Sequence, residues 1–153
     1  MIIYSEPFDK WKCVYKKCNA HCCVEGREVT QGDIERIAKA TGLNPNEFAD
    51  LEDKRGLFKL KGKSGKCFFL DGNSCTLHEK GAKPIFCQMF PFKFEGIIYA
   101  DEIFLKVSVI KDCPGFDEDV EIPEDFEIKI EELGSKFIKE IKDFQRIEEK
   151  NGT

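Results

Sequence analysis

The C-terminal part of the chain has the clearest periodic pattern of apolar residues. From Phe126 to Phe144 apolar side chains recur every three or four residues, with Glu and Lys between them. This spacing is typical of an amphipathic helix of about six turns, which we place at residues 122–150. Its apolar stripe consists of Phe126, Ile130, Leu133, Phe137, Ile141 and Phe144. Because a single stripe on a terminal helix normally docks on its own domain, we expect it to cover the core rather than a second subunit.

A pair of short helices is predicted earlier in the chain. The first has Thr30 as its N-cap, Asp33 three positions later as in a capping box, and Gly42 as its C-cap glycine. The second starts at an Asn-Pro pair, which supplies an N-cap and a proline at the first helical position. Its expected buried residues are Phe48 and Leu51.

The middle of the chain predicts short strands separated by turns. Aromatic and β-branched residues bounded by Gly, Pro, Asn and Asp carry this pattern. The predicted strands are residues 57–60, 67–70, 92–95 and 97–109, with Glu95-Gly96 as the turn between the last two. The predicted turns are Asp71-Gly72-Asn73 and Cys113-Pro114-Gly115, and the remaining elements are a strand end or helical turn at 75–79 and a short helix at 84–90.

The composition describes a soluble globular protein with a heavily charged surface. Hydrophobic residues make up 41% of the 153 residues and charged residues 35%, against a typical charged share of about 25%. The net charge is −5, and positive and negative residues are interspersed along the chain. We therefore expect no basic surface that would attract a nucleic-acid backbone. The length suits one domain and we expect a monomer; the lead-in is residues 1–12, the cysteine core 13–115 and the C-terminal helix 122–150.

The N-terminal residues lack the basic start, long apolar run and cleavage site of a secretory signal. No apolar run approaches the roughly 20 residues that span a bilayer. We therefore expect a cytoplasmic protein without membrane association. Thiols stay reduced in that compartment, so eight cysteines indicate metal ligands or redox groups rather than disulfides.

The cysteines form two clusters and one later turn. Thiolate is the soft ligand that holds zinc and iron–sulfur clusters. Adjacent side chains point to different sides of the backbone, so one tetrahedral ion seldom takes both Cys22 and Cys23. Two histidines beside cysteines, His21 and His78, are further candidates for a mixed site. The candidate metal ligands are Cys13, Cys18, Cys22, Cys23, Cys67, Cys75, Cys87 and Cys113.

The cysteine spacing leaves zinc and iron–sulfur open, with a slight preference for iron–sulfur. A zinc ribbon would show two Cys-x2-Cys knuckles, and the sequence contains none. The Cys-x3-Cys-x2-Cys pattern of radical enzymes fails as well, because Cys23 follows Cys22 directly. Cys113-Pro114 is similar to the Cys-Pro pair that closes a ferredoxin run.

In combination these segments resemble the YkgJ-type cysteine-cluster proteins, a family also described as a zinc- or iron-chelating domain and related to the flagellin lysine N-methylases. The residues that carry the resemblance are Cys13-x4-Cys18-x3-Cys22-Cys23, Cys67-Phe68-Phe69-Leu70, Cys75-Thr76-Leu77-His78-Glu79 and Pro84-Ile85-Phe86-Cys87-Gln88-Met89-Phe90-Pro91. It implies metal ligation by Cys13, Cys18, Cys22 or Cys23, Cys67, Cys75 and Cys87, with Cys113 a frequent later addition. Lys83 and Gln88 stand where the family has arginines.

We therefore expect an α+β fold: a small single domain in which a short antiparallel sheet and helices surround a cysteine-ligated metal centre, with a long C-terminal amphipathic helix. The predicted function is to hold an iron–sulfur cluster, in electron transfer or as part of an enzyme that modifies a protein partner or substrate. A zinc-stabilised, non-catalytic binding module is the alternative. The methylase kinship alone suggests a third, a protein-lysine methyltransferase-like protein that uses S-adenosylmethionine, although the glycine-rich cofactor loop is missing.

Overall fold

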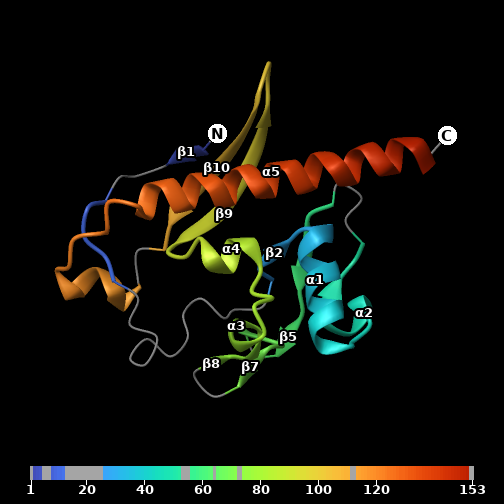
Figure 1. Ribbon diagram of the computed structural model, residues 1–153, viewed down its shortest axis with the longest axis horizontal. Coiled ribbons are helices and arrows are strands. Elements are labelled where there is room, and N and C mark those ends of the chain that lie inside the picture. Colours follow the sequence, from blue (N-terminus) through green and yellow to red (C-terminus); the bar gives the residue numbers. More distant parts are fainter. Residues whose placement is uncertain are drawn as a thin grey trace.

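The long C-terminal helix α5 (Phe126–Asn151) runs along the molecule and crosses a β-hairpin made of β9 (Phe92–Tyr99) and β10 (Ile103–Val109), as Figure 1 shows. The structure is a computed structural model that describes residues 2–4, 8–12, 26–52, 56–63, 65–71, 74–110 and 113–151. Helix α5 also contacts two elements away from the hairpin, α1 (Gln31–Thr41) and α4 (Ile85–Gln88). The predicted α+β class is confirmed.

The hairpin has the antiparallel pairing that the sequence predicted, and the chain's lead-in extends it. Strand β1 (Ile2–Tyr4) lies parallel to β10, with Ile3 opposite Lys106, so the sheet order is β1-β10-β9. A parallel partner must come from a distant part of the chain, because a tight turn joins only antiparallel strands. The start of the sequence therefore meets residues 103–109 in this sheet.

Glu95-Gly96 does not form the turn that we predicted. Strand β9 runs through it, and the hairpin turns instead at residues 100–102. Lys106 pairs with Gly96, whereas the next residue, Val107, pairs with Phe94, so Glu95 is an extra residue in the strand. This is a β-bulge, the position in which glycine is often found inside a strand.

The predicted C-terminal helix is confirmed, although it begins at Phe126 rather than at Ile122. Its stripe residues Ile130, Phe137 and Ile141 are fully or almost fully buried. They belong to one hydrophobic cluster with side chains from α4, β9 and β10. The stripe therefore docks on its own chain, as expected.

Helix α1 begins and ends where predicted. The Asp33 N–H donates to Thr30 Oγ1 at 2.9 Å and the Thr30 N–H donates to Asp33 Oδ2 at 3.0 Å, which completes the capping box. Gly42 closes the helix with φ of 76°. In the following helix α2 (Pro45–Phe48), Phe48 is buried as predicted, but Leu51 is 41% exposed. The prediction for Leu51 is wrong because strand β3 (Ala49–Asp50) replaces the helix before that residue.

The cysteine-bearing segments fold as small antiparallel pairs around a second hydrophobic cluster. The predicted strand at 67–70 is interrupted by a turn at Phe68 and Phe69, and residues 28–29 form a further short strand. Two short strands, at residues 70–71 and 74–75, pair across residues 72–73. Residues 72–73 and residues 13–25 lie outside the described residues. The elements are β2 (Glu28–Val29), β4 (Phe58–Leu60), β5 (Gly62–Lys63), β6 (Lys66–Cys67), β7 (Leu70–Asp71), β8 (Ser74–Cys75), α3 (Thr76–Glu79) and the 3-10 helix η1 (Pro114–Glu118).

A polar contact joins α5 to the start of α1. The Glu140 carboxylate accepts hydrogen bonds from Thr30 Oγ1 at 2.5 Å and from both terminal nitrogens of Arg36 at 2.9 and 3.0 Å. Gly32 makes the approach possible, since a Cβ there would overlap the Glu140 carboxylate. Burial opposes ionisation of Glu140, but the hydrogen bonds from Arg36 and Thr30 outweigh it and hold the pKa of Glu140 below its ordinary value.

This contact predicts how stability depends on acid. Because the pKa of Glu140 is lower in the folded state, its stabilising contribution is complete above about pH 4.3 and is lost as the pH falls through the folded value. The Glu140→Gln variant cannot titrate there, so we expect its unfolding free energy to fall less steeply below about pH 4.3 than that of the wild type. Urea unfolding at several acidic pH values measures the two slopes, and parallel slopes would contradict the assignment.

Two physical reasons favour glycine over any other residue at position 56. It takes φ of +87°, and a Cβ there would lie 2.6 Å from a ring carbon of Phe144 on α5. Gly65 takes a similar φ of +82° but has open space around it. We expect Gly65→Ala to cost about 1 kcal/mol from backbone strain alone, and Gly56→Ala to cost about 2–4 kcal/mol because strain and overpacking add. Equal losses in chemical unfolding would show that the contact with Phe144 is unimportant.

Candidate metal centre

Helix α4 presents Cys87, and a buried carboxylate fixes the start of that helix. The Ile85 N–H, two residues before Cys87, donates to Asp33 Oδ1 at 3.1 Å. Asp33 also accepts from Arg36 Nη2 at 2.7 Å, and its side chain is completely buried. Burial raises the pKa of Asp33, while hydrogen bonds from Thr30, Arg36 and Ile85 act in the opposite direction. The position of Cys87, itself 7% exposed, therefore depends on helix α1.

Cys67 and Cys75 come from neighbouring small strand pairs. Cys67 ends β6 and Cys75 ends β8, and the turn between them is closed by Thr76, whose N–H and Oγ1 both donate to the Phe69 carbonyl at 3.0 and 3.1 Å. The Phe69 N–H donates to Cys67 Sγ at 3.4 Å. Hydrogen bonds of this kind from the backbone orient a sulfur ligand and tune a metal centre. Two short strand pairs that follow one another along the chain thus hold Cys67 and Cys75 in the same region.

The three thiols of Cys67, Cys75 and Cys87 lie close enough to influence one another electrostatically. Burial, together with the charges of Cys67 and Cys75, raises the pKa of Cys87 to about 12. Arg27 and Lys83 act in the opposite direction because their positive charges favour the thiolate. Without a cation, then, Cys87 prefers to stay protonated, and its thiolate form requires positive charge beside it.

Arg27 is the residue of this site that the sequence did not indicate. Its side chain is almost completely buried, at 4% exposure, and its guanidinium carbon lies 5.7 Å from the centre of the Phe90 ring. A buried arginine beside thiols supplies a permanent positive charge in an apolar setting. The Arg27 carbonyl accepts a hydrogen bond from the Leu60 N–H at 2.9 Å, which fixes the backbone of Arg27 beside strand β4. The pattern of polar residues in the sequence does not reveal this pairing.

Cys113 occupies a separate aromatic environment. Its thiol is 3% exposed and accepts a hydrogen bond from Trp11 Nε1 at 3.4 Å. The Trp11 ring lies 6.2 Å from that of Phe90 and 5.9 Å from that of Phe126. Phe90 therefore has Trp11 near its ring as well as the guanidinium of Arg27, and it connects the environment of Cys113 with that of Cys87.

Lys12 and Gly26, which flank the first cysteine cluster in the sequence, are fixed by backbone hydrogen bonds. The Lys12 N–H donates to the Gly115 carbonyl at 3.2 Å, two residues after Cys113. The Gly26 N–H donates to the Leu60 carbonyl at 2.8 Å, immediately before Arg27. Lys12 therefore lies beside the segment of Cys113 and Gly26 beside strand β4, whereas the cysteines between them lie outside the described residues.

The structure leaves part of the predicted ligand set untested. Four predicted thiol ligands and one histidine lie outside the described residues, namely Cys13, Cys18, Cys22, Cys23 and His21. His78 lies in α3, but its side chain is outside the described part. Within the described part, no three Cys, His, Asp or Glu side chains form a metal site by themselves. All four described cysteines are thiols rather than disulfides, namely Cys67, Cys75, Cys87 and Cys113.

Fold and site together define a small α+β domain with thiols gathered in its interior. The model of the CxxCxxCC family, described as "Putative zinc- or iron-chelating domain", matches residues 12–114, and the chain belongs to this family. Its N-terminal cysteines are spaced more widely than the family name suggests, with four residues between Cys13 and Cys18 and three between Cys18 and Cys22. No curated protein and no solved structure matches the sequence significantly. Among the described helices none is long and apolar enough to cross a membrane.

The described donor set fits a soft metal. Sulfur ligands suit zinc and iron–sulfur clusters, and of the three thiols Cys67 and Cys87 are buried and Cys75 is partly exposed. A bound cation would favour the thiolate form of Cys87 that burial disfavours, in the same direction as Arg27 and Lys83. The described residues that would take part in holding a metal are these three, which do not form a complete site by themselves.

Proposed function

We propose that this protein holds an iron–sulfur cluster through cysteine thiolates. The observation that supports this proposal is that the buried Cys87 lies within electrostatic reach of Cys67 and Cys75, two thiols from other elements. Membership of a zinc- or iron-chelating family supports a metal in general. An iron–sulfur cluster takes thiolate ligands from loops and short strands of this kind.

The surroundings of the thiols support a redox centre. The Phe69 N–H donates to the sulfur of Cys67. A protein sets the reduction potential of such a cluster through hydrogen bonds to its sulfurs and through the exclusion of solvent. When bound, the cluster would supply one-electron chemistry, for electron transfer or within an enzyme that modifies a partner. The chain's own residues bind it, exclude water and provide the positive charge of Arg27.

Anaerobic purification followed by iron, sulfide and zinc analysis tests this proposal. We expect a brown protein that contains iron and acid-labile sulfide, with a visible spectrum that bleaches on reduction. A colourless protein without iron would overturn the proposal. Metal content is measured on protein never exposed to air, because exposed clusters are lost by oxidation.

Zinc is the second candidate, and the description of the matching family favours it as much as iron. A zinc ion would serve as a closed structural site in a non-catalytic binding module. Stoichiometric zinc in a colourless protein, with no iron after anaerobic preparation, would establish this alternative.

A further inference from the structure

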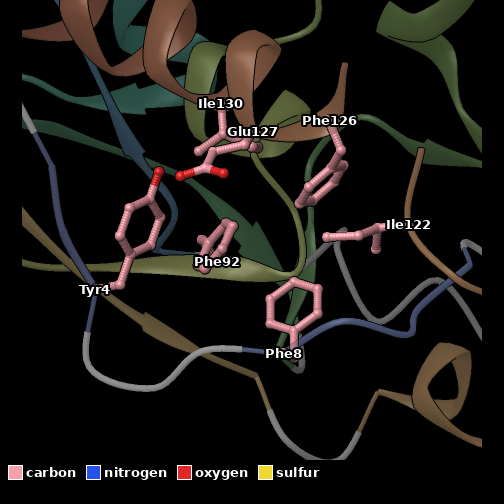
Figure 2. Close-up of a pocket in the computed structure, with 7 residues that line it drawn as sticks. All are labelled: Tyr4, Phe8, Phe92, Ile122, Phe126, Glu127 and Ile130. Atoms are coloured by element: carbon pink, nitrogen blue, oxygen red, sulfur yellow. The ribbon is translucent and has the colours of Figure 1, made fainter. Parts of the chain in front are cut away.

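An aromatic pocket lies between the lead-in strand, the start of β9 and the first turns of α5. Its volume is about 360 Å³, at the lower end of the range of small-molecule sites. Figure 2 shows Phe92 between Tyr4 and the pair Phe8 and Phe126, with all four rings around one space. Ile122, Glu127 and Ile130 complete the lining.

The rings form a continuous apolar wall. The Phe92 ring centre lies 5.3 Å from that of Tyr4 and 5.4 Å from that of Phe8, and the Phe8 and Phe126 centres are 6.0 Å apart. Aromatic faces carry negative partial charge, so a cavity lined in this way favours a cation as well as an apolar body.

The polar groups of the pocket accept hydrogen bonds but offer none to a ligand. Tyr4 donates its hydroxyl proton to Glu131 Oε1 at 3.0 Å, which leaves the tyrosine oxygen as an acceptor. Glu127 presents a carboxylate on the same side, where Figure 2 shows it beside the Tyr4 hydroxyl. Among the described residues that line the pocket, none is positively charged. Such a set complements a ligand that donates hydrogen bonds and carries positive charge.

The surface beside the pocket is also negatively charged. Glu127 also lines an open hollow on α5 together with Glu124, Glu131 and Glu132. The nearby Lys129 is paired with Asp125 at 3.0 Å and belongs to neither lining set. The local field therefore draws cations toward the mouth of the pocket.

We propose that this pocket binds an organic ammonium ion, in which a protonated amine is attached to an apolar body. The apolar part would lie among the rings of Phe8, Phe92 and Phe126, and the ammonium would face Glu127 and the Tyr4 oxygen. The ligand could be a free amine or the side chain of a lysine in a peptide, since both present this chemistry. This site is independent of the metal centre.

The test compares phenethylamine with 2-phenylethanol, its neutral counterpart, by calorimetric titration of the metal-loaded protein at neutral pH. We expect the amine to bind at least about tenfold more tightly than the alcohol. Comparable affinities, or no binding of the amine, would overturn the proposal. Titration with a capped Gly-Lys-Gly peptide distinguishes the sources: tighter binding of the peptide assigns the site to a protein lysine, and tighter binding of phenethylamine assigns it to a free amine.

Two variants locate the binding. Glu127 is exposed, so Glu127→Gln should fold normally and should weaken amine binding about tenfold while leaving alcohol binding unchanged. Glu132→Gln makes the same charge change on the same helix outside the pocket, and because it removes only a distant, screened charge it should weaken amine binding less than about twofold. Equal weakening by both variants would mean that the amine is attracted only by the general charge of α5, and would refute a site at Glu127.

Discussion

The Cys87→Ser variant is expected to lose most of its metal and much of its thermal stability together. Serine has nearly the size of cysteine, but its hydroxyl does not ionise at neutral pH and is a poor ligand for a soft metal. Because metal binding and folding are linked, loss of a ligand appears as loss of stability. We expect about 4 kcal/mol, or about 8–16 °C in melting temperature for a domain of this size. Metal analysis and thermal unfolding of the same preparation measure both effects.

A control separates the metal from the cost of a buried hydroxyl. Ala82→Ser adds a hydroxyl at a neighbouring buried position, 4% exposed, and removes no thiol. It should lower stability by about 1 kcal/mol and keep the metal. In addition, chelator-treated wild type and chelator-treated Cys87→Ser should unfold at similar temperatures. A large difference between those two metal-free proteins, or full metal content in the variant, would contradict a ligand role for Cys87.

Elements with local signals were predicted well. The capping box of Thr30 and Asp33, the C-cap Gly42 and the stripe of α5 all depend on residues within a few positions of one another. Errors occurred where a distant partner decides the structure. Glu95-Gly96 has the composition of a turn, yet pairing with β10 continues the strand and converts the glycine into a bulge. Leu51 fits a helical spacing, but pairing of β3 with β4 ends that helix first.

The candidate site was predicted in its chemistry and only partly in its geometry. Cysteine is rare enough that clustering alone indicates Cys67, Cys75 and Cys87. In the structure Cys67 and Cys75 lie within electrostatic reach of Cys87, although the described residues form no metal site by themselves. It places Cys113 in a different environment, against Trp11, which the sequence did not suggest. Arg27 was missed because arginine is usually a surface residue, and only the tertiary structure shows that this one is buried.

The second large effect is expected from Asp33→Ala, far from any sulfur ligand in the sequence. This carboxylate joins helix α1 to helix α4, since it accepts from Thr30 N at 3.0 Å and Arg36 Nη2 at 2.7 Å in and before α1, and from Ile85 N at 3.1 Å in α4. Its removal leaves the buried N–H groups of Thr30 and Ile85 without this acceptor. Arg36 loses one of its two anionic partners and keeps the other, Glu140. We expect a loss of about 3–5 kcal/mol in unfolding free energy.

Metal content distinguishes this role of Asp33 from simple structural damage. Because Ile85 N begins the helix that carries Cys87, we expect Asp33→Ala to bind metal more weakly even at temperatures where it is fully folded. The matched control is Asp143→Ala, which removes an exposed carboxylate paired with Lys139 at 3.0 Å and should cost no more than about 0.5 kcal/mol. Urea unfolding and competition with a chelator measure the two quantities. If the folded Asp33→Ala protein held its metal as tightly as Asp143→Ala, the carboxylate would stabilise the fold without positioning Cys87.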